Sequence, residues 1–216
     1  MGICRFDDNR LGIVLGDEIA DVTEVIDSRF TATWPLPRYD LLIANLPSLR
    51  SDLEKAAQNG TRFAIEDVKF LAPVANPGKI MGAPANYAAH NEEAERDAGI
   101  NFGARVAPIQ EMGLFLKATS SLIGFGERIV VDREDRRTDH EVELGVIIGK
   151  RGRRIKYEDA LDYVSGYSIA LDMTIRGKEE RSLRKSLDTF SVLGPWMVTA
   201  DEFGDPSDRK LGLWVN

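Results

Sequence analysis

The stretch that decides the fold is Asp139-His140-Glu141-Val142-Glu143-Leu144-Gly145-Val146-Ile147-Ile148-Gly149. Its second half is almost wholly apolar, which is typical of a buried strand. Side chains alternate between the two faces of a strand, so Glu141 and Glu143 share one face and His140 lies on the other, where we expect it to pack in the core. Two carboxylates at the mouth of a buried strand are costly unless a partner such as a divalent cation compensates their charge.

The spacing of the two glutamates leaves two interpretations open. Two residues advance about 6.6 Å along a strand, so both carboxylates can bind one cation. Oxygen ligands favour a hard ion such as Mg²⁺, Mn²⁺ or Ca²⁺ over zinc. Asp139 lies on the same face but about 13 Å from Glu143 along the strand, too far to share the ion. On spacing alone, however, the solvent-exposed face of an edge strand explains the pair better.

Composition and charge exclude several classes of protein. The chain has 216 residues and a net charge of −7, which argues against nonspecific nucleic-acid binding. No apolar run is long enough to span a bilayer, and the N-terminus has no apolar signal core. The single cysteine, Cys4, cannot form an internal disulfide, which fits a reducing compartment. We therefore expect a cytoplasmic protein with no membrane partner and no nucleic-acid partner.

The chain divides into two expected parts around a linker that contains proline and glycine. Residues 1–72 are predicted to form a small α+β domain with strands at 3–6, 10–15 and 18–22 and a helix at 48–58. Residues 70–78 contain the linker, and 78–216 form a larger, mainly β domain. Its expected strands are at 114–117, 128–131, 141–148, 163–172 and 196–199, with helices at 88–98 and 157–163.

Asp172 is a third candidate carboxylate, because it ends the apolar segment Gly166-Tyr167-Ser168-Ile169-Ala170-Leu171. A carboxylate from a second strand is what a pair such as Glu141 and Glu143 needs to complete a metal site. The alternative is that Asp172 caps a following helix and pairs with Arg176 four residues later.

His90 and Glu93 are the candidate acid–base pair, since residues three apart on a helix face one another. A carboxylate beside an imidazole raises its basicity, as a general base requires. For an isolated spacing of this kind, a surface histidine beside a solvated glutamate is the better explanation, but His90 is the only natural acid–base histidine in the chain. Lys117 and Lys185 have two interpretations in the same way: each binds an anionic substrate, or each is a solvated loop cation.

Taken in order, these motifs resemble the fumarylacetoacetate hydrolase family over residues 78–216. The motifs that carry the resemblance are Asn86-Tyr87-x-x-His90-x-x-Glu93, Phe115-Leu116-Lys117, His140-Glu141-Val142-Glu143-Leu144, Gly166-Tyr167 through Asp172 to Arg176, and Lys185-Ser186-Leu187-Asp188-Thr189-Phe190 through Gly194-Pro195-Trp196. Residues 1–72 resemble the small N-terminal domain of that family more loosely.

The resemblance implies an α+β, mainly β fold: a mixed β-sandwich roll, usually a homodimer, behind a small N-terminal domain. It implies a divalent cation, commonly Mg²⁺ or Mn²⁺ with Ca²⁺ as a substitute. By position, the metal ligands would be Glu141, Glu143 and Asp172. The catalytic residues would be His90, Glu93 and Lys185, and the substrate contacts would come from Arg176, Lys117 and Tyr87.

The implied reaction is metal-dependent hydrolysis of a C–C bond in a β-dicarbonyl or 2-oxo acid, such as an acylpyruvate. The cation would act as a Lewis acid that stabilises the enolate, and the His90–Glu93 pair would activate water. The same site could instead run a decarboxylation, isomerisation or hydration of a 2-oxo dioate in aromatic catabolism. A metal-binding scaffold without catalysis is a third alternative.

Two departures from the family pattern bear on the site. Gly177 stands where an aspartate often follows the arginine, and Glu179 stands where a glutamine is more usual. In addition, family members continue beyond the position of Asn216 through further strands and a Gly-Thr-Pro loop. We therefore expect the chain to be the truncated part of a longer protein.

Overall fold

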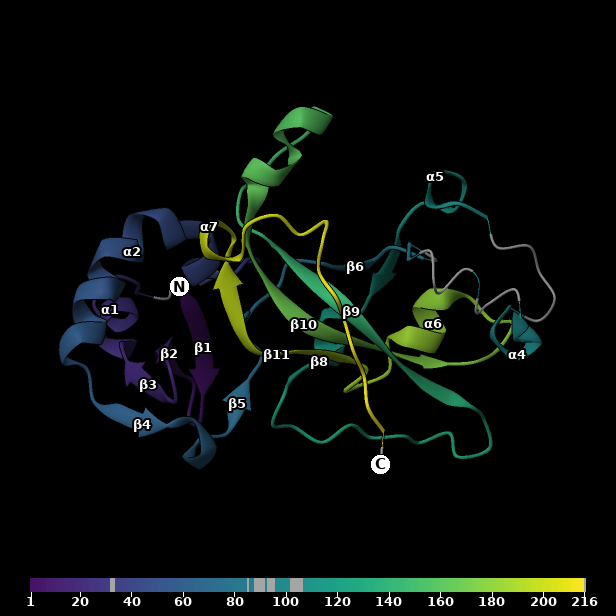
Figure 1. Cartoon of the computed structure of the whole chain (residues 1–216), viewed down its shortest axis with the longest axis horizontal. Coiled ribbons are helices and arrows are strands. Elements are labelled where there is room, and N and C mark those ends of the chain that lie inside the picture. The colour runs from purple at the N-terminus through teal and green to yellow at the C-terminus, as the bar shows by residue number, and fades with distance from the viewer. Residues whose placement is uncertain (32–33, 85, 88–91, 93–95, 102–106, 216) are drawn as a thin grey trace.

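A computed structural model describes residues 1–31, 34–84, 86–87, 92, 96–101 and 107–215 (Figure 1). These residues form a nine-stranded sheet and a separate two-stranded sheet. The main sheet has the order β4-β3-β2-β1-β11-β10-β9, with β5 paired to β1 and β8 paired to β11. The smaller sheet joins β6 and β7. The predicted α+β, mainly β class is confirmed.

The strands of the described chain are, in order, β1 (Gly2–Phe6), β2 (Arg10–Leu15), β3 (Glu18–Asp21), β4 (Arg62–Ala64), β5 (Phe70–Leu71), β6 (Ile80–Gly82), β7 (Phe115–Lys117), β8 (Leu122–Gly124), β9 (Thr138–Ile148), β10 (Val164–Ile175) and β11 (Ser191–Thr199). The α-helices are α1 (Thr23–Asp27), α2 (Leu41–Asn59), α4 (Ala98–Asn101), α5 (Ile109–Met112), α6 (Arg181–Lys185) and α7 (Ala200–Phe203). The 3₁₀ helices are η1 (Ile65–Asp67), η2 (Thr119–Ser121) and η3 (Tyr157–Tyr163).

The N-terminal strands form where the sequence predicts them. β1 and β2 make an antiparallel hairpin in which Phe6 pairs with Arg10, and β3 continues the meander. The turn uses Asp7 and Asn9 at positive φ, a conformation that these two residue types tolerate. The predicted three-strand unit is therefore confirmed.

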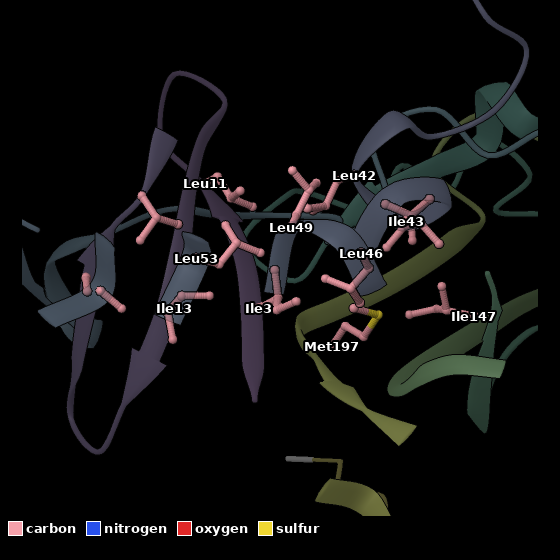
Figure 2. Close-up of a cluster of buried hydrophobic side chains, with 14 residues drawn as sticks. Ile3, Leu11, Ile13, Leu42, Ile43, Leu46, Leu49, Leu53, Ile147 and Met197 are labelled. Atoms are coloured by element: carbon pink, nitrogen blue, oxygen red, sulfur yellow. The ribbon is translucent and has the colours of Figure 1, made fainter. Parts of the chain in front are cut away.

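Helix α2 is longer than predicted, because its N-cap lies further upstream. The side chain of Asp40 accepts a hydrogen bond from the backbone N–H of Ile43 at 3.1 Å, and Pro47 is accommodated inside the first turns. The helix buries one apolar face against the sheet, and Figure 2 shows that face meeting the strands. The buried residues of this face are Leu42, Ile43, Leu46, Leu49, Leu53 and Ala57.

A long-range pairing joins the two parts of the chain into one sheet. Gly2 pairs with Val198 and Ile3 with Met197, so β11 lies next to β1. Met197 and Ile147 belong to the same buried cluster as Ile3 and the face of α2 (Figure 2). The division into one domain at residues 1–72 and another at residues 78–216 remains a prediction.

Three expectations about the second part are wrong. Residues 128–131 are not a strand, and Val130 bonds through its N–H to the hydroxyl of Thr189. The second half of β9 is not buried, since Val146 and Ile148 are 50% and 54% exposed. His140 is exposed rather than packed in the core. The common reason is position: β9 is the end strand of the described sheet, and only Ile147 within it is buried.

The two helices expected in this part have different outcomes. Residues 157–163 form a helix over the predicted range, but of the 3₁₀ type. The helix expected at 88–98 falls mainly outside the residues that the structure describes. None of the described helices is long and apolar enough to cross a bilayer.

Candidate active site

The acidic residues share one face because of the register between β9 and β10. These strands are antiparallel, with Glu141 opposite Asp172 and Glu143 opposite Ala170. Residues directly opposite each other in an antiparallel pair project from the same face. Glu141, Glu143 and Asp172 therefore lie on one face of this hairpin, as the alternation along β9 predicts for the two glutamates.

Lys185 bridges two of the three carboxylates. Its ammonium donates to Glu141 Oε2 at 2.7 Å, to Asp172 Oδ2 at 2.5 Å and to the hydroxyl of Thr174 at 2.7 Å. The residue is 6% exposed, and its Nζ lies 5.2 Å from the centroid of the Phe115 ring. A solvated loop cation is therefore the wrong description of Lys185.

Lys117 is a second buried ammonium in the same group. It forms an ion pair with Asp172 and donates to the carbonyl of Phe190 at 2.7 Å, and it is 7% exposed. Burial lowers the pKa of Lys117, although the negative charge of Asp172 opposes that effect. The ion pair indicates that Lys117 orients Asp172.

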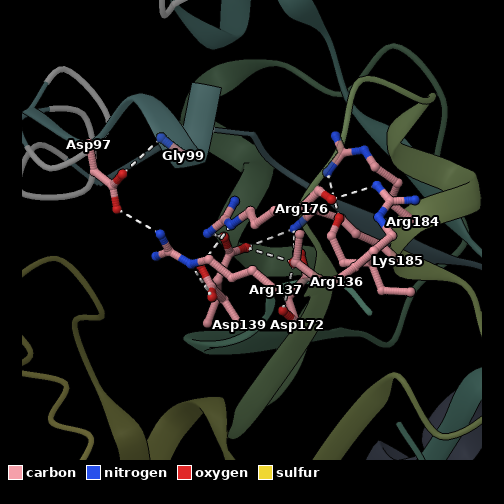
Figure 3. Close-up of polar contacts among 12 residues, drawn as sticks. Asp97, Gly99, Arg136, Arg137, Asp139, Asp172, Arg176, Arg184 and Lys185 are labelled. Atoms are coloured by element: carbon pink, nitrogen blue, oxygen red, sulfur yellow. Dashed lines mark hydrogen bonds and ion pairs between the residues drawn. The ribbon is translucent and has the colours of Figure 1, made fainter. Parts of the chain in front are cut away.

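Arg176 connects Asp139 to the site. Its Nε donates to Asp139 Oδ2 at 2.7 Å and its Nη2 to Glu141 Oε1 at 2.6 Å, as Figure 3 shows around the labelled Asp139 and Arg176. The alternative in which Asp172 caps a helix and pairs with Arg176 is wrong, because β10 continues to Ile175. Asp139 is also bonded by Arg137 at 2.8 Å. Burial would raise the pKa of Asp139, but these two arginines lower it.

Glu143 is the carboxylate with the least compensation. Burial raises the pKa of Glu143 to about 7, with further contributions from the negative charges of Glu141 and Asp172. Within the described part of the chain, no lysine or arginine forms an ion pair with it. The phenol of Tyr87 lies beside Glu143 and accepts a hydrogen bond from the N–H of Leu144 at 3.1 Å.

The donor set fits a hard divalent cation by its chemistry. Three carboxylates share one face, where burial and then the negative charges of Glu141 and Asp172 raise the pKa of Glu143. In the present arrangement, the ammonium of Lys185 holds Glu141 and Asp172, and no three acidic, histidine or cysteine side chains among the described residues already converge as a metal cluster.

The other predicted residues have mixed outcomes. His90 and Glu93 lie outside the described residues, so their pairing remains a prediction. Tyr87 is 40% exposed beside the acidic face. Glu179, one of the departures from the family pattern, forms a two-pronged ion pair with Arg136 at 2.9 Å for both bonds.

Thr174 is a site residue that the sequence reasoning missed. It is fully buried, and its hydroxyl lies 2.7 Å from Lys185 Nζ and 3.2 Å from Glu141 Oε2. It follows Asp172 by two residues on the same strand, so it shares the acidic face. The period of two that grouped Glu141 with Glu143 would have found it.

Fold and site together define a mainly β protein whose acidic centre is held by buried lysines. Residues 79–216 match the family model described as fumarylacetoacetate (FAA) hydrolase C-terminal. The chain belongs to the fumarylacetoacetate hydrolase family, as the motifs predict.

Two maleylpyruvate hydrolases are similar to this chain. The chain is 49% identical over 218 residues to a maleylpyruvate hydrolase of Aquipseudomonas alcaligenes, covering 100% of this chain and 76% of that protein. The crystal structure of maleylpyruvate hydrolase from Sphingobium sp. SYK-6 has a TM-score of 0.77 and 38% identity, over 96% of this chain and 71% of the other. The same enzyme in complex with manganese(II) ion and pyruvate has a TM-score of 0.76.

A more distant relative carries a different activity in its name. The mitochondrial oxaloacetate tautomerase of Rattus norvegicus is 38% identical over 154 residues, which are 69% of this chain. This chain spans only 46% of that relative's length.

Proposed function

We propose that this chain is a divalent-metal-dependent hydrolase that cleaves the C–C bond of an acylpyruvate, a β-dicarbonyl 2-oxo acid. The observation that carries the proposal is the group of Glu141, Glu143 and Asp172 on one strand-pair face with Lys185 buried among them. The names of the similar proteins support it, because two are maleylpyruvate hydrolases and one was crystallised with manganese(II) and pyruvate.

In this proposal, Glu141, Glu143 and Asp172 hold Mg²⁺ or Mn²⁺, with Ca²⁺ as a substitute of the same hard type. When bound, the cation supplies Lewis-acid stabilisation of negative charge on the substrate oxygens. Lys117 keeps Asp172 on the acidic face, and Arg176 does the same for Glu141, since each carboxylate pairs with that cation as well as with Lys185. We also propose that Lys117, Arg176 and the neighbouring Tyr87 bind the substrate.

Lys185 provides positive charge at the centre of the site. Its three N–H donors go to two carboxylates and a hydroxyl, which fix the ammonium in place, so its positive charge is already positioned when negative charge develops nearby. His90, oriented by Glu93, takes the proton of the attacking water. A homodimer in the cytoplasm is part of the same proposal.

The test is a pyruvate assay on protein stripped of metal with EDTA and then supplied with MgCl₂ or MnCl₂. We expect maleylpyruvate to yield pyruvate only after metal is restored, and Glu141→Gln to lose the response to metal. The matched control is Glu54→Gln, which removes an exposed carboxylate that pairs with Arg50 on α2, away from the acidic face. Undiminished turnover in the metal-free protein would contradict the proposal.

Product analysis separates the related reactions. Hydrolysis gives pyruvate and the free acid, decarboxylation gives carbon dioxide, and tautomerisation of oxaloacetate changes the enol content without releasing pyruvate. His90→Ala tests the scaffold alternative, because a protein without catalysis would show no change in any activity.

A further inference from the structure

A pocket of about 310 Å³ opens beside the acidic face. Its walls are the residues around the end of α5 and β7 on one side and the start of α6 on the other: Pro84, Met112, Gly113, Leu114, Phe115, Leu116, Glu180, Arg181 and Ser182. Phe115 also contacts the ammonium of Lys185. The pocket therefore borders the proposed catalytic lysine without being part of the carboxylate group.

Arg181 provides a cation in the wall of this pocket. The residue is half-buried, and its Nη2 lies 3.4 Å from the sulfur of Met112. Within the described part of the chain, no carboxylate forms an ion pair with it. A thioether is a weak acceptor, so most of the guanidinium donors of Arg181 remain available to a ligand.

Other guanidinium groups lie near Arg181. The pKa of Arg184 is lowered first by burial and then by the positive charges of Arg181 and Arg176. Carboxylates oppose this positive charge, because Glu179 and Glu141 raise the pKa of Arg184 and the exposed carboxylate of Glu180 lines the pocket. Anion binding at Arg181 must overcome that repulsion, which makes Glu180 a useful control.

The spacing between Arg181 and Lys185 determines how long a ligand must be to contact both residues. Both residues lie on α6, four positions apart, so they project from the same side with about 5–6 Å between their Cβ atoms. A short acyl chain can span that distance. Its carbon atoms would contact Leu114 and Phe115 while its far end meets the guanidinium.

We propose that this pocket binds the acyl end of the substrate and that Arg181 selects acylpyruvates whose acyl group ends in a carboxylate. This inference rests on the proposed function, since it assumes an acylpyruvate at the acidic face. The guanidinium matches a carboxylate with two parallel hydrogen bonds, which a neutral methyl group cannot accept.

The test compares succinylpyruvate, which carries a terminal carboxylate, with acetylpyruvate, which does not. Wild type, Arg181→Gln, Arg181→Lys and Glu180→Gln are assayed with saturating MgCl₂. We expect Arg181→Gln to lower the ratio of the two kcat/KM values about tenfold, through the KM for succinylpyruvate. Arg181→Lys should recover part of the loss, and Glu180→Gln should shift the ratio the other way.

Calorimetric titration with succinate separates this inference from the proposed function. We expect Arg181→Gln to weaken succinate binding about tenfold whether or not either acylpyruvate is cleaved. If wild type cleaves neither substrate, the hydrolase proposal fails and the titration alone decides the role of Arg181. Equal effects of Arg181→Gln on both substrates, or unchanged succinate affinity, would overturn the inference.

Discussion

Replacing Glu143 with glutamine should stabilise the metal-free protein at neutral and alkaline pH. The pKa of Glu143 is raised from 4.5 to about 7, first by burial and then by repulsion from Glu141 and Asp172. The unfolded chain therefore releases this proton at lower pH than the folded chain. The ionised carboxylate costs the folded state nothing below about pH 4.5, and the full cost is present above about pH 7.

The size of the effect follows from the same values. A pKa raised from 4.5 to about 7 corresponds to about 3 kcal/mol as an upper limit. The Glu143 side chain is partly exposed, so solvent screening reduces the expected gain to about 1–2 kcal/mol. For a chain of this length, that gain raises the Tm by about 2–8 °C. Glutamine has nearly the same shape, so it can keep a contact with Tyr87.

The assay is urea denaturation of wild type and Glu143→Gln in EDTA at pH 8 and at pH 4.5. We expect the variant to be more stable at pH 8 and equal to wild type at pH 4.5. In saturating MgCl₂ the order should reverse, because only wild type gains the free energy of binding the cation to the folded state.

Glu179→Gln is the matched control. Its ion pair with Arg136 lowers the pKa of Glu179 to about 2, so removing this charge should not stabilise the protein at pH 8. Equal stability of wild type and Glu143→Gln at pH 8 without metal would refute the reasoning. So would a stability gain that persists unchanged at pH 4.5.

Two further changes test the site and the core. Thr174→Val removes a fully buried hydroxyl 2.7 Å from Lys185. We therefore expect kcat for acylpyruvate cleavage to fall about tenfold with little change in KM, and Thr174→Ser to restore kcat. A parallel rise in KM would instead indicate disrupted substrate binding. The Leu53 side chain has no exposed area, so Leu53→Ala leaves a cavity under α2. The free energy of unfolding, measured by urea denaturation, should drop by about 2–5 kcal/mol. A loss below about 1 kcal/mol would show that the cluster collapses around the gap.

Local sequence patterns predicted the strands whose positions depend on residues near in sequence. The hairpin of β1 and β2, the strand β3 and the strand β9 follow from alternation and turn residues near in sequence. Alternation also placed Glu141 and Glu143 on one face. Family motifs predicted that Asp172 and Lys185 belong to the same site. In the structure Lys185 contacts both Asp172 and Glu141.

Burial and charge compensation were not predictable from local patterns. The apolar end of β9 resembles a buried strand, yet Val146 and Ile148 are half exposed, because the strand lies at the end of the described sheet. The sequence around Lys117 allows a solvated loop cation, but in the structure the side chain is buried against Asp172. A lysine is stable in such a place only when a carboxylate from another strand is present, and that depends on register between distant segments.

The sequence by itself determined the family, several of the elements and the shared face of Glu141 and Glu143. Only the tertiary structure decided that Glu141 stands opposite Asp172, that Lys185 bridges them and that Glu143 has no lysine or arginine ion pair among the described residues. The pairing of Gly2 with Val198 was likewise decided only by the tertiary structure. The physical reason is that alternation sets the face of a side chain within one strand, whereas register and burial depend on which strand lies beside it.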